Sequence, residues 1–210
     1  MLKNNKSSVK IKAVLFDLGK VLLSFNFEPA FRRLAKHGAG DPQEVRLFFI
    51  RSGLEVLYDG GKISSRDFYT AVKRGLNLKN LSFSQFRLVW NNIFTPITPM
   101  VRLVGRLHGK KRLVLISNTN AMHFEHAKDR YAVLRKFDDH VLSYKAKVRK
   151  PDPRIYRLAS KACRASPREI FYIDDRKDLT QAARELGFHV HTYKNDFGAL
   201  ESALKRKGVL

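Results

Sequence analysis

Polar side chains suited to binding a cation and a phosphate follow three short apolar runs of the sequence. Asp17 ends the run IKAVLF, Ser117 and Asn118 follow LVLI, and Asp174 and Asp175 follow FYI. Magnesium is bound in proteins by a few carboxylates together with water and substrate oxygens. Carboxylates together with a hydroxyl group therefore indicate a site for a hard cation and a phosphate.

A basic side chain that could contact the same anion lies in the segment KVRKPDPRIY. Lys150 stands just before a helix that Asp152 and Pro153 are expected to open, because proline suits the first helical position. A lysine and the free amides of a helix start can both face an anion. We therefore add Lys150 to the predicted phosphate site.

These residues can meet only if their apolar runs are neighbouring strands of one sheet. The buried-strand candidates are residues 11–16, 113–116, 140–143, 169–173 and 188–192. Helical patterns separate them, and this alternation predicts the α/β class with a doubly wound parallel sheet. Ligands bind outside the carboxyl ends of the strands in such sheets. The polar residues at three of these ends are thus expected to line one crevice.

The segment 25–96 has little strand pattern and reads as a small helical insertion after the first strand. Three helix starts are expected within it, at Asp41-Pro42, at Ser64 with Asp67 and at Ser82 with Gln85. Three more are expected in the rest of the chain, at Thr98-Pro99, Asp152-Pro153 and Ser166-Pro167, of which the last is a short turn. We expect residues 1–24 and 97–210 to form the α/β core and residues 25–96 to form the insertion. Its pocket-lining residues are expected among Phe25, Phe27, Trp90 and Asn91.

The chain resembles the haloacid dehalogenase-like hydrolases over nearly its whole length. The motifs FDLGKVLL, LISNTN, KVRKPDPRIY and FYIDD occur in the order and spacing of that superfamily. The chain looks closest to the subfamily IA-like phosphatases, which carry a small helical cap after the first motif. This branch includes bacterial sugar-phosphate phosphatases, an α-glucose-1-phosphate phosphatase among them, and GLEVLYDGGKISSRDFYTAV resembles part of its cap. The resemblance implies a Rossmann-like core and a small phosphorylated substrate, with a sugar phosphate expected.

The same resemblance implies a two-step phosphoryl transfer. Asp17 would attack phosphorus and form an aspartyl-phosphate, which water then hydrolyses. Ser117, Asn118 and Lys150 would bind the phosphoryl oxygens, and Lys150 would also orient Asp17. A carboxylate attacks phosphorus only when it is held in line with a phosphoryl group whose charge is neutralised.

A magnesium ion is the cofactor that the resemblance implies. The expected ligands are the carboxylates of Asp17 and Asp175 and the main-chain carbonyl of Gly19, with Asp174 reaching the ion through water. Nearby Mg²⁺ and Lys150 would both favour an ionised Asp17 at neutral pH.

Two positions depart from the pattern of the family. Gly19 stands where relatives carry the aspartate that acts as general acid and base, a contribution of about 10²- to 10⁴-fold. Members of the same branch share the DLG form, so a cap residue, a water or His123 is expected to take over. Leu179 replaces a common asparagine near the metal, and Asp178 is expected to compensate.

The charge of the chain permits a second hypothesis. Lys and Arg number 41 against 19 Asp and Glu, which gives a net charge of +22 and favours association with anions. Arg154, Arg157, Lys161 and Arg164 recur at helical spacing on one face. The alternative function is therefore a catalytically impaired protein of this fold that binds RNA or another polyanion, although no nucleic-acid motif supports it. Dehalogenation is a weaker alternative, because attack of the same aspartate on carbon needs no metal ion and leaves Asp174 and Asp175 without a role.

The remaining composition bears on location. The lone Cys163 cannot form a disulfide within the chain and fits a reducing compartment, where we expect it to pack a helix. The first twelve residues are polar and basic, and the apolar stretch behind them is too short for a signal peptide or membrane span. A cytoplasmic protein is therefore expected, and nothing in the sequence indicates its oligomeric state.

Overall fold

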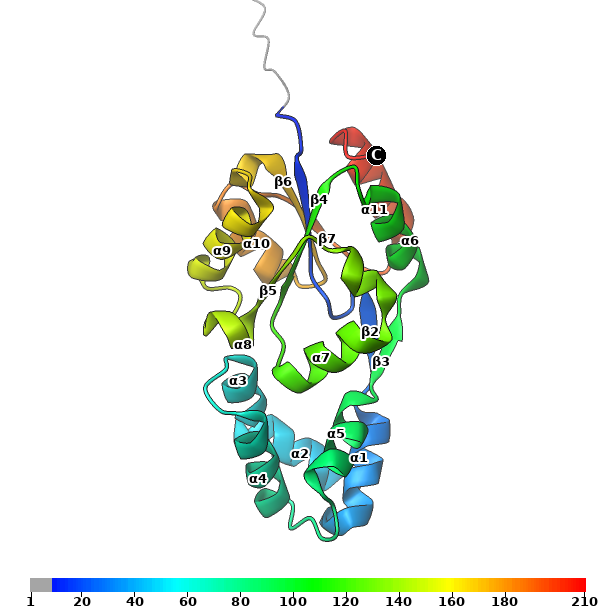
Figure 1. Cartoon of the computed structure of the whole chain (residues 1–210), viewed down its shortest axis with the longest axis vertical. Helices are drawn as coiled ribbons and strands as arrows, with labels where there is room; N and C mark the ends of the chain where they lie inside the picture. Colours follow the sequence, from blue (N-terminus) through cyan, green and yellow to red (C-terminus); the bar gives the residue numbers. More distant parts are fainter. Residues whose placement is uncertain (1–8) are drawn as a thin grey trace, which may run out of the picture.

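A five-stranded parallel sheet forms the centre of the protein in the computed structural model, which describes residues 9–210 (Figure 1). The strand order is β5-β4-β1-β6-β7. The strands are β1 (Ala13–Phe16), β4 (Arg112–Ser117), β5 (Asp139–Leu142), β6 (Ile170–Asp174) and β7 (His189–Thr192). All five predicted strands are present, with ends shifted by one or two residues. The predicted doubly wound α/β class is confirmed.

Side chains of the central strand alternate between two apolar layers, because successive residues of a strand point to opposite faces. Val14 and Phe16 pack in the cluster that contains residues of α6 (Thr98–Leu107), α7 (Ala121–Arg130) and α11 (Phe197–Arg206). Ala13 and Leu15 pack in the opposite cluster, with residues of α9 (Pro153–Cys163) and α10 (Lys177–Glu185). Cys163 is buried in this second cluster, as expected. Both faces of the sheet are thus covered, and ligands can approach only at its ends.

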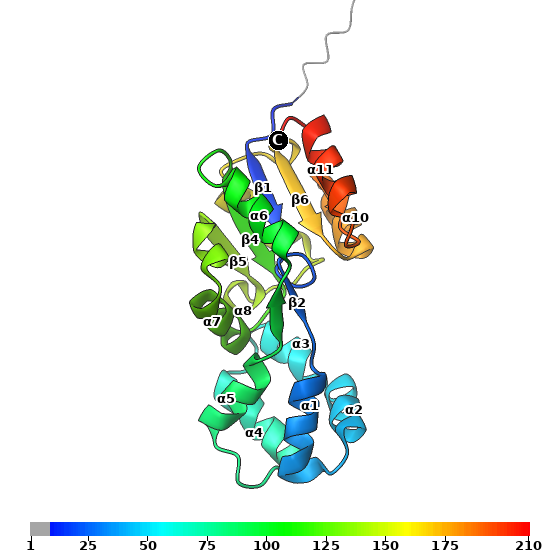
Figure 2. The same ribbon diagram turned by 90° about the vertical axis from the view of Figure 1, so that its right-hand side faces the viewer.

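A separate group of helices lies beyond the carboxyl ends of the strands (Figures 1 and 2). They are α1 (Glu28–Leu34), α2 (Pro42–Ser52), α3 (Leu54–Asp59), α4 (Ser65–Gly75) and α5 (Phe83–Asn91), with a π-helical turn at Ala35–Ala39. Phe49, Phe68, Phe86 and Trp90 are buried at the centre of this group. The predicted helical cap after the first strand is confirmed, with an apolar core of its own.

The helix starts follow the expected capping chemistry in most places. Asp41 and Asp152 accept hydrogen bonds from the first turns of α2 and α9, and both predicted capping boxes form at the starts of α4 and α5. Ser166 opens only the short 3₁₀ turn Pro167–Glu169, as expected. Thr98 is the exception, because α6 already includes it and Ile97 is the capping residue. Two short helical elements complete the chain: the 3₁₀ turn Ala132–Lys136 and α8 (Ser143–Ala146).

A two-stranded antiparallel ribbon joins the cap to the core, and the sequence did not predict it. β2 (Leu23–Phe25) pairs with β3 (Phe94–Pro96), so Phe25 lies opposite Phe94. Each strand has three residues, too few to give a strand pattern in the sequence. The expected domain limits at 24/25 and 96/97 fall at this ribbon. We propose that the ribbon is the boundary between core and cap.

Two statements about location follow from the described residues. No helix within residues 9–210 has the length and apolar character needed to cross a bilayer. Most of the polar amino-terminal segment, residues 1–8, lies outside the described residues. The cytoplasmic location stays a prediction.

Candidate active site

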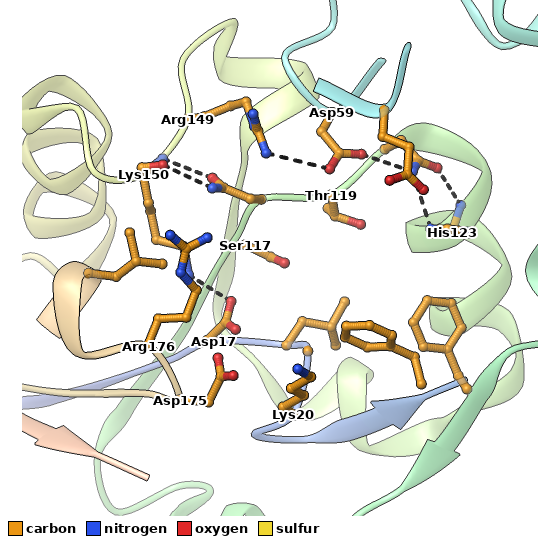
Figure 3. Close-up of a pocket in the computed structure, with 18 of the residues that line it drawn as sticks. Asp17, Lys20, Asp59, Ser117, Thr119, His123, Arg149, Lys150, Asp175 and Arg176 are labelled. Atoms are coloured by element: carbon orange, nitrogen blue, oxygen red, sulfur yellow. Dashed lines mark hydrogen bonds and ion pairs between the residues drawn. The ribbon is translucent and has the colours of Figure 1, made fainter. Parts of the chain in front are cut away.

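A pocket of about 430 Å³ opens between the carboxyl ends of the strands and the cap (Figure 3). Every predicted site residue except Asp174 lines it. Its lining includes Asp17, Gly19, Lys20, Phe25, Phe27, Glu55, Asp59, Ile93, Phe94, Ser117, Asn118, Asn120, His123, Arg149, Lys150, Asp175, Arg176 and Leu179. The predicted convergence of the strand ends on one crevice is therefore what the structure shows, and the roles of these residues remain proposals.

The amino group of Lys150 connects two of the carboxylates. Its Nζ donates hydrogen bonds to Asp17 Oδ1 and Asp174 Oδ2, each over 2.7 Å, and a longer one of 3.3 Å to the hydroxyl of Tyr172. The Lys150 side chain is 1% exposed. Burial alone would lower the pKa of Lys150, but the two carboxylates outweigh burial and raise it. Lys150 is therefore a fixed positive charge beside one oxygen of Asp17.

The three carboxylates form a compact group that suits a divalent cation. One oxygen from each of Asp17, Asp174 and Asp175 lies within 4.8 Å of the others, and no other such group of three occurs in residues 9–210. Burial, and then the charge of Asp174, raise the pKa of Asp17 to about 7 although Lys150 lowers it. The same two causes raise the pKa of Asp175. When all three are ionised, three carboxylates against one lysine leave two negative charges, so these hard oxygen ligands fit Mg²⁺.

Ser117 and Asn118 differ in what their side chains can offer a phosphate. Ser117 is 3% exposed, and its hydroxyl has no hydrogen-bond partner among the described residues. The side chain of Asn118 is already engaged, since its Nδ2 donates to the carbonyl of Lys150 over 3.0 Å and its Oδ1 accepts from the Lys150 amide over 2.8 Å. Ser117 is thus available to a phosphoryl oxygen, whereas the Asn118 side chain fixes the backbone of Lys150.

A phenyl ring occupies the space beside Gly19 where a side chain would begin. A β-carbon at this position would come within 3.0 Å of Phe25 Cε1. Phe25 comes from β2 and makes edge contacts with Phe27 and Phe94. A side chain at position 19 would therefore have to displace the Phe25 ring.

Two expected substitutes do not have the geometry for their role. His123 is 7% exposed and uses both ring nitrogens, one with the carbonyl of Trp90 (3.1 Å) and one with the side chain of Asn120 (3.2 Å). Burial lowers its pKa to about 4, so at neutral pH it is uncharged and has no spare nitrogen. Asp178 pairs with Arg176 on an exposed surface and is not part of the carboxylate group. The expectation that Asp178 supports the metal is wrong.

The cap supplies a polar wall that the sequence did not reveal. Glu55 and Asp59, four residues apart on one side of α3, line the pocket. Asp59 Oδ1 accepts from Asn120 Nδ2 over 3.0 Å, and Asp59 Oδ2 lies 3.9 Å from the guanidinium of Arg149. Their i,i+4 spacing was the one available signal, but only the tertiary contacts show which way they face.

Two of the four cap residues that were expected to line the pocket do so. Phe25 and Phe27 line the pocket, whereas Trp90 and Asn91 are buried away from it. Trp90 stacks on the ring of His123 with the centroids 5.4 Å apart, so it supports the pocket from behind. The other cap aromatics form the core of the cap, as expected.

Replacing Glu55 with glutamine should stabilise the protein at pH 8. Burial, and then Asp59, raise the pKa of Glu55 from 4.5 to about 7 although Arg149 lowers it. The folded protein therefore holds this proton more tightly than the unfolded chain, and ionisation costs folding free energy as pH rises from 4.5 towards 7. We expect Glu55→Gln to raise the free energy of unfolding by about 1–3 kcal/mol at pH 8.

Urea unfolding in the presence of a chelator would measure this gain. It should shrink as the pH falls through 7 and vanish below 4.5, where Glu55 is largely protonated in both states. The matched change Glu44→Gln, on the exposed surface of α2, should shift stability by less than about 0.5 kcal/mol. A gain at Glu55 that does not vary with pH would contradict the prediction.

The basic residues singled out in the sequence lie largely on α9. Arg154, Arg157 and Lys161 line a shallow surface groove with Lys62 of the cap and Lys147. Arg154 pairs with Asp152, and Lys147 donates to the carbonyl of Gly61. Part of this charge is thus engaged within the protein.

A parallel sheet with three clustered carboxylates at its strand ends and a helical cap beyond them suits a hydrolase that uses a metal ion. The chain matches the family model of the haloacid dehalogenase-like hydrolases over residues 11–187. It belongs to this family. The resemblance inferred from the four motifs is confirmed, and so is the prediction of an enzyme at the level of the hydrolase family.

Similar proteins come from Bacteroides thetaiotaomicron. A D-ribitol-5-phosphate phosphatase is 24% identical over 198 residues, which cover 90% of this chain and 94% of the relative. The crystal structure of a family enzyme superposes with a TM-score of 0.82 at 27% identity and covers 91% of this chain and 98% of its own. A complex of such an enzyme with magnesium and inorganic phosphate gives a TM-score of 0.79 at 28% identity, with 90% and 98% covered.

Proposed function

We propose that this protein is a magnesium-dependent phosphatase that releases phosphate from a small phosphorylated metabolite, with Asp17 as the nucleophile. The observation that carries the proposal is the buried Lys150, held between Asp17 and Asp174 at the pocket floor. The phosphatase activity of a relative that spans nearly the whole chain, and the magnesium and phosphate bound to a similar structure, support it.

Asp17 is arranged to attack phosphorus with one defined oxygen. Lys150 holds Oδ1, which leaves Oδ2 to form the new bond. In the first step, the Oδ2–phosphorus bond forms and the bond from phosphorus to the substrate oxygen breaks, giving an aspartyl-phosphate. In the second step, water attacks phosphorus, and Asp17 and inorganic phosphate are released. The Ser117 hydroxyl would donate to a phosphoryl oxygen during both steps, and the Lys150 amino group would do so by giving up its longer bond to the Tyr172 hydroxyl.

The metal ligands that we propose are the carboxylates of Asp17, Asp174 and Asp175 and the carbonyl of Gly19. When bound, Mg²⁺ would neutralise phosphoryl charge and favour the ionised form of Asp17. Because the pKa of Asp17 is raised to about 7, this carboxyl group is protonated in about half of the metal-free molecules at that pH. The ionisation of Asp17 that we expect at neutral pH would thus depend on the cation as well as on Lys150.

The substrate oxygen that leaves phosphorus must gain a proton, and Gly19 has no side chain to give one. His123 is uncharged and has both nitrogens engaged. We propose that water in the pocket supplies the proton. Esters of acidic alcohols, which leave without protonation, should therefore react fastest.

The cap, residues 25–96, is proposed to select the substrate. It contributes Phe25, Phe27, Glu55, Asp59 and Phe94 to the pocket wall. A sugar phosphate is the substrate class that we propose, since this wall offers both apolar faces and polar groups. The named activity of the ribitol-phosphate relative supports that class.

Removing magnesium should abolish phosphate release. The purified protein is assayed with a panel of sugar phosphates and 4-nitrophenyl phosphate, with Mg²⁺ and with a chelator. We expect turnover only with Mg²⁺, because the two surplus negative charges of the carboxylate group would otherwise repel the substrate phosphate. The aryl ester should be cleaved faster than the alkyl esters.

Two outcomes would count against the proposal. Turnover that is equal in chelator would remove the metal from the mechanism. No cleavage of any ester would favour the alternative function, binding of RNA or another polyanion through the basic face of α9. Binding to heparin that weakens steeply with salt would then support the alternative.

A further inference from the structure

We propose that Glu55 and Asp59 make the pocket selective for an uncharged, hydroxyl-rich leaving group, that of an alditol or sugar monophosphate, and exclude esters with a second anionic group. This rests on the proposed phosphatase function and deepens it. The two carboxylates are outside the predicted catalytic set. They are proposed as specificity-determining residues that contact the substrate.

The first step of the argument is their position. Figure 3 shows Asp59 and Arg149 across the pocket from Asp17 and Asp175. A substrate whose phosphate lies at Asp17 therefore presents its other end to this wall. Glu55 stands one turn before Asp59 on α3, so both carboxylates meet the same part of the substrate.

The second step is how firmly the wall is built. Asp59 is fixed by three contacts with the core: Asn120 Nδ2 to its Oδ1 (3.0 Å), Arg149 near its Oδ2 (3.9 Å), and the Ser143 hydroxyl to its main-chain carbonyl (2.5 Å). Glu55 is half-buried and has no hydrogen-bond or ion-pair partner within the described chain. A buried carboxylate without a partner is costly, and a substrate hydroxyl would provide one.

The third step is the charge balance at this end of the pocket. Arg149 offsets one carboxylate, and Arg176, the other guanidinium in the lining, pairs with Asp178. At pH 8, above the raised pKa of Glu55, one negative charge is left at this residue. Substrate hydroxyls can donate to carboxylates, whereas a substrate carboxylate or second phosphate would be repelled by them.

The apolar side of the pocket agrees with this substrate class. Phe27, Ile93 and Phe94 line it between the two polar ends. A carbon chain or ring that carries hydroxyl groups presents both apolar and polar surface, which such a wall can match. The pocket volume of about 430 Å³ is in the range of small-molecule sites.

The test compares two esters with the same six-carbon chain, glucitol 6-phosphate and 6-phosphogluconate. They differ at the end far from phosphorus, where one carries a hydroxyl and the other a carboxylate. We expect kcat/KM to favour glucitol 6-phosphate by at least about tenfold. Glu55→Gln should lower this preference at least about fivefold, and Glu55→Lys should reverse it. Glu44→Gln, on the exposed face of α2, should leave the preference unchanged.

The outcomes separate this inference from the phosphatase proposal. Cleavage of 4-nitrophenyl phosphate with no preference between the two six-carbon esters would overturn the inference and leave the phosphatase standing. A preference that Glu55→Gln does not change would also overturn it. No cleavage of any ester, the aryl ester included, would overturn both. The thermal midpoint of each Glu55 variant shows whether it is folded, and glutamine, nearly isosteric, keeps the test valid if the lysine variant is not.

Discussion

Replacing Asp17 with asparagine should lower kcat for every phosphate ester by about 10⁴-fold or more, the scale seen when a nucleophile is removed. Asparagine has nearly the same shape but cannot attack phosphorus. The fold should survive, because Lys150 keeps its second partner, Asp174, at 2.7 Å. Since the pKa of Asp17 is raised to about 7, its ionised form costs folding free energy, and the variant should be at least as stable as the parent at pH 8.

Phosphate release and thermal unfolding in chelator would check the two parts of this prediction. Asp129→Asn, the same change on the exposed surface of α7, serves as the control for both. If Asp17→Asn kept a tenth of the parent activity, water rather than Asp17 would have to attack phosphorus. The proposed aspartyl-phosphate would then be wrong.

Replacing Lys150 with methionine should damage both stability and catalysis. The change leaves Asp17 and Asp174 buried without their cation, and breaking a buried ion pair costs about 3–5 kcal/mol. The phosphoryl group would also lose a donor, so kcat/KM should fall by about 10²- to 10³-fold. Mg²⁺ should stabilise this variant more than the parent, because the carboxylate group then has three negative charges and no lysine.

Urea unfolding with and without Mg²⁺ measures this difference directly. Lys128→Met on the exposed side of α7 gives the effect of a lysine-to-methionine change without the carboxylates, and it should be within about 0.5 kcal/mol of the parent. Equal stability of Lys150→Met and Lys128→Met would mean that Lys150 does not hold the carboxylates together.

The strand ends of the core were predictable because each carries a local signal. The run that ends at Asp17 and the run that ends at Asp174 are apolar, and parallel strands place their carboxyl ends at one edge. What the side chain of each residue does was not predictable. The phosphate-binding role expected of Asn118 stays a prediction, and no local signal indicated that its side-chain amide contacts both the N–H and the carbonyl of Lys150, 32 residues away.

The cap wall was harder to predict for a physical reason. Glu55 and Asp59 face the pocket because Asn120, Ser143 and Arg149 of the core hold the end of α3 against it. These contacts join segments more than sixty residues apart, and no local pattern reports them. Reasoning from the sequence therefore brought the strand-end residues to one pocket, but it did not bring out the two carboxylates of α3 that line the opposite wall.

The ring beside Gly19 has a consequence for the evolutionary history of this enzyme. An ancestor with aspartate at this position could lose it in one step, after which Phe25 could settle into the space against Phe27 and Phe94. Regaining a side chain here would require the Phe25 ring to shift, because a new β-carbon would meet the ring at 3.0 Å. Positions 19 and 25 are thus coupled through this contact, and the effect of restoring aspartate at one would depend on the residue at the other.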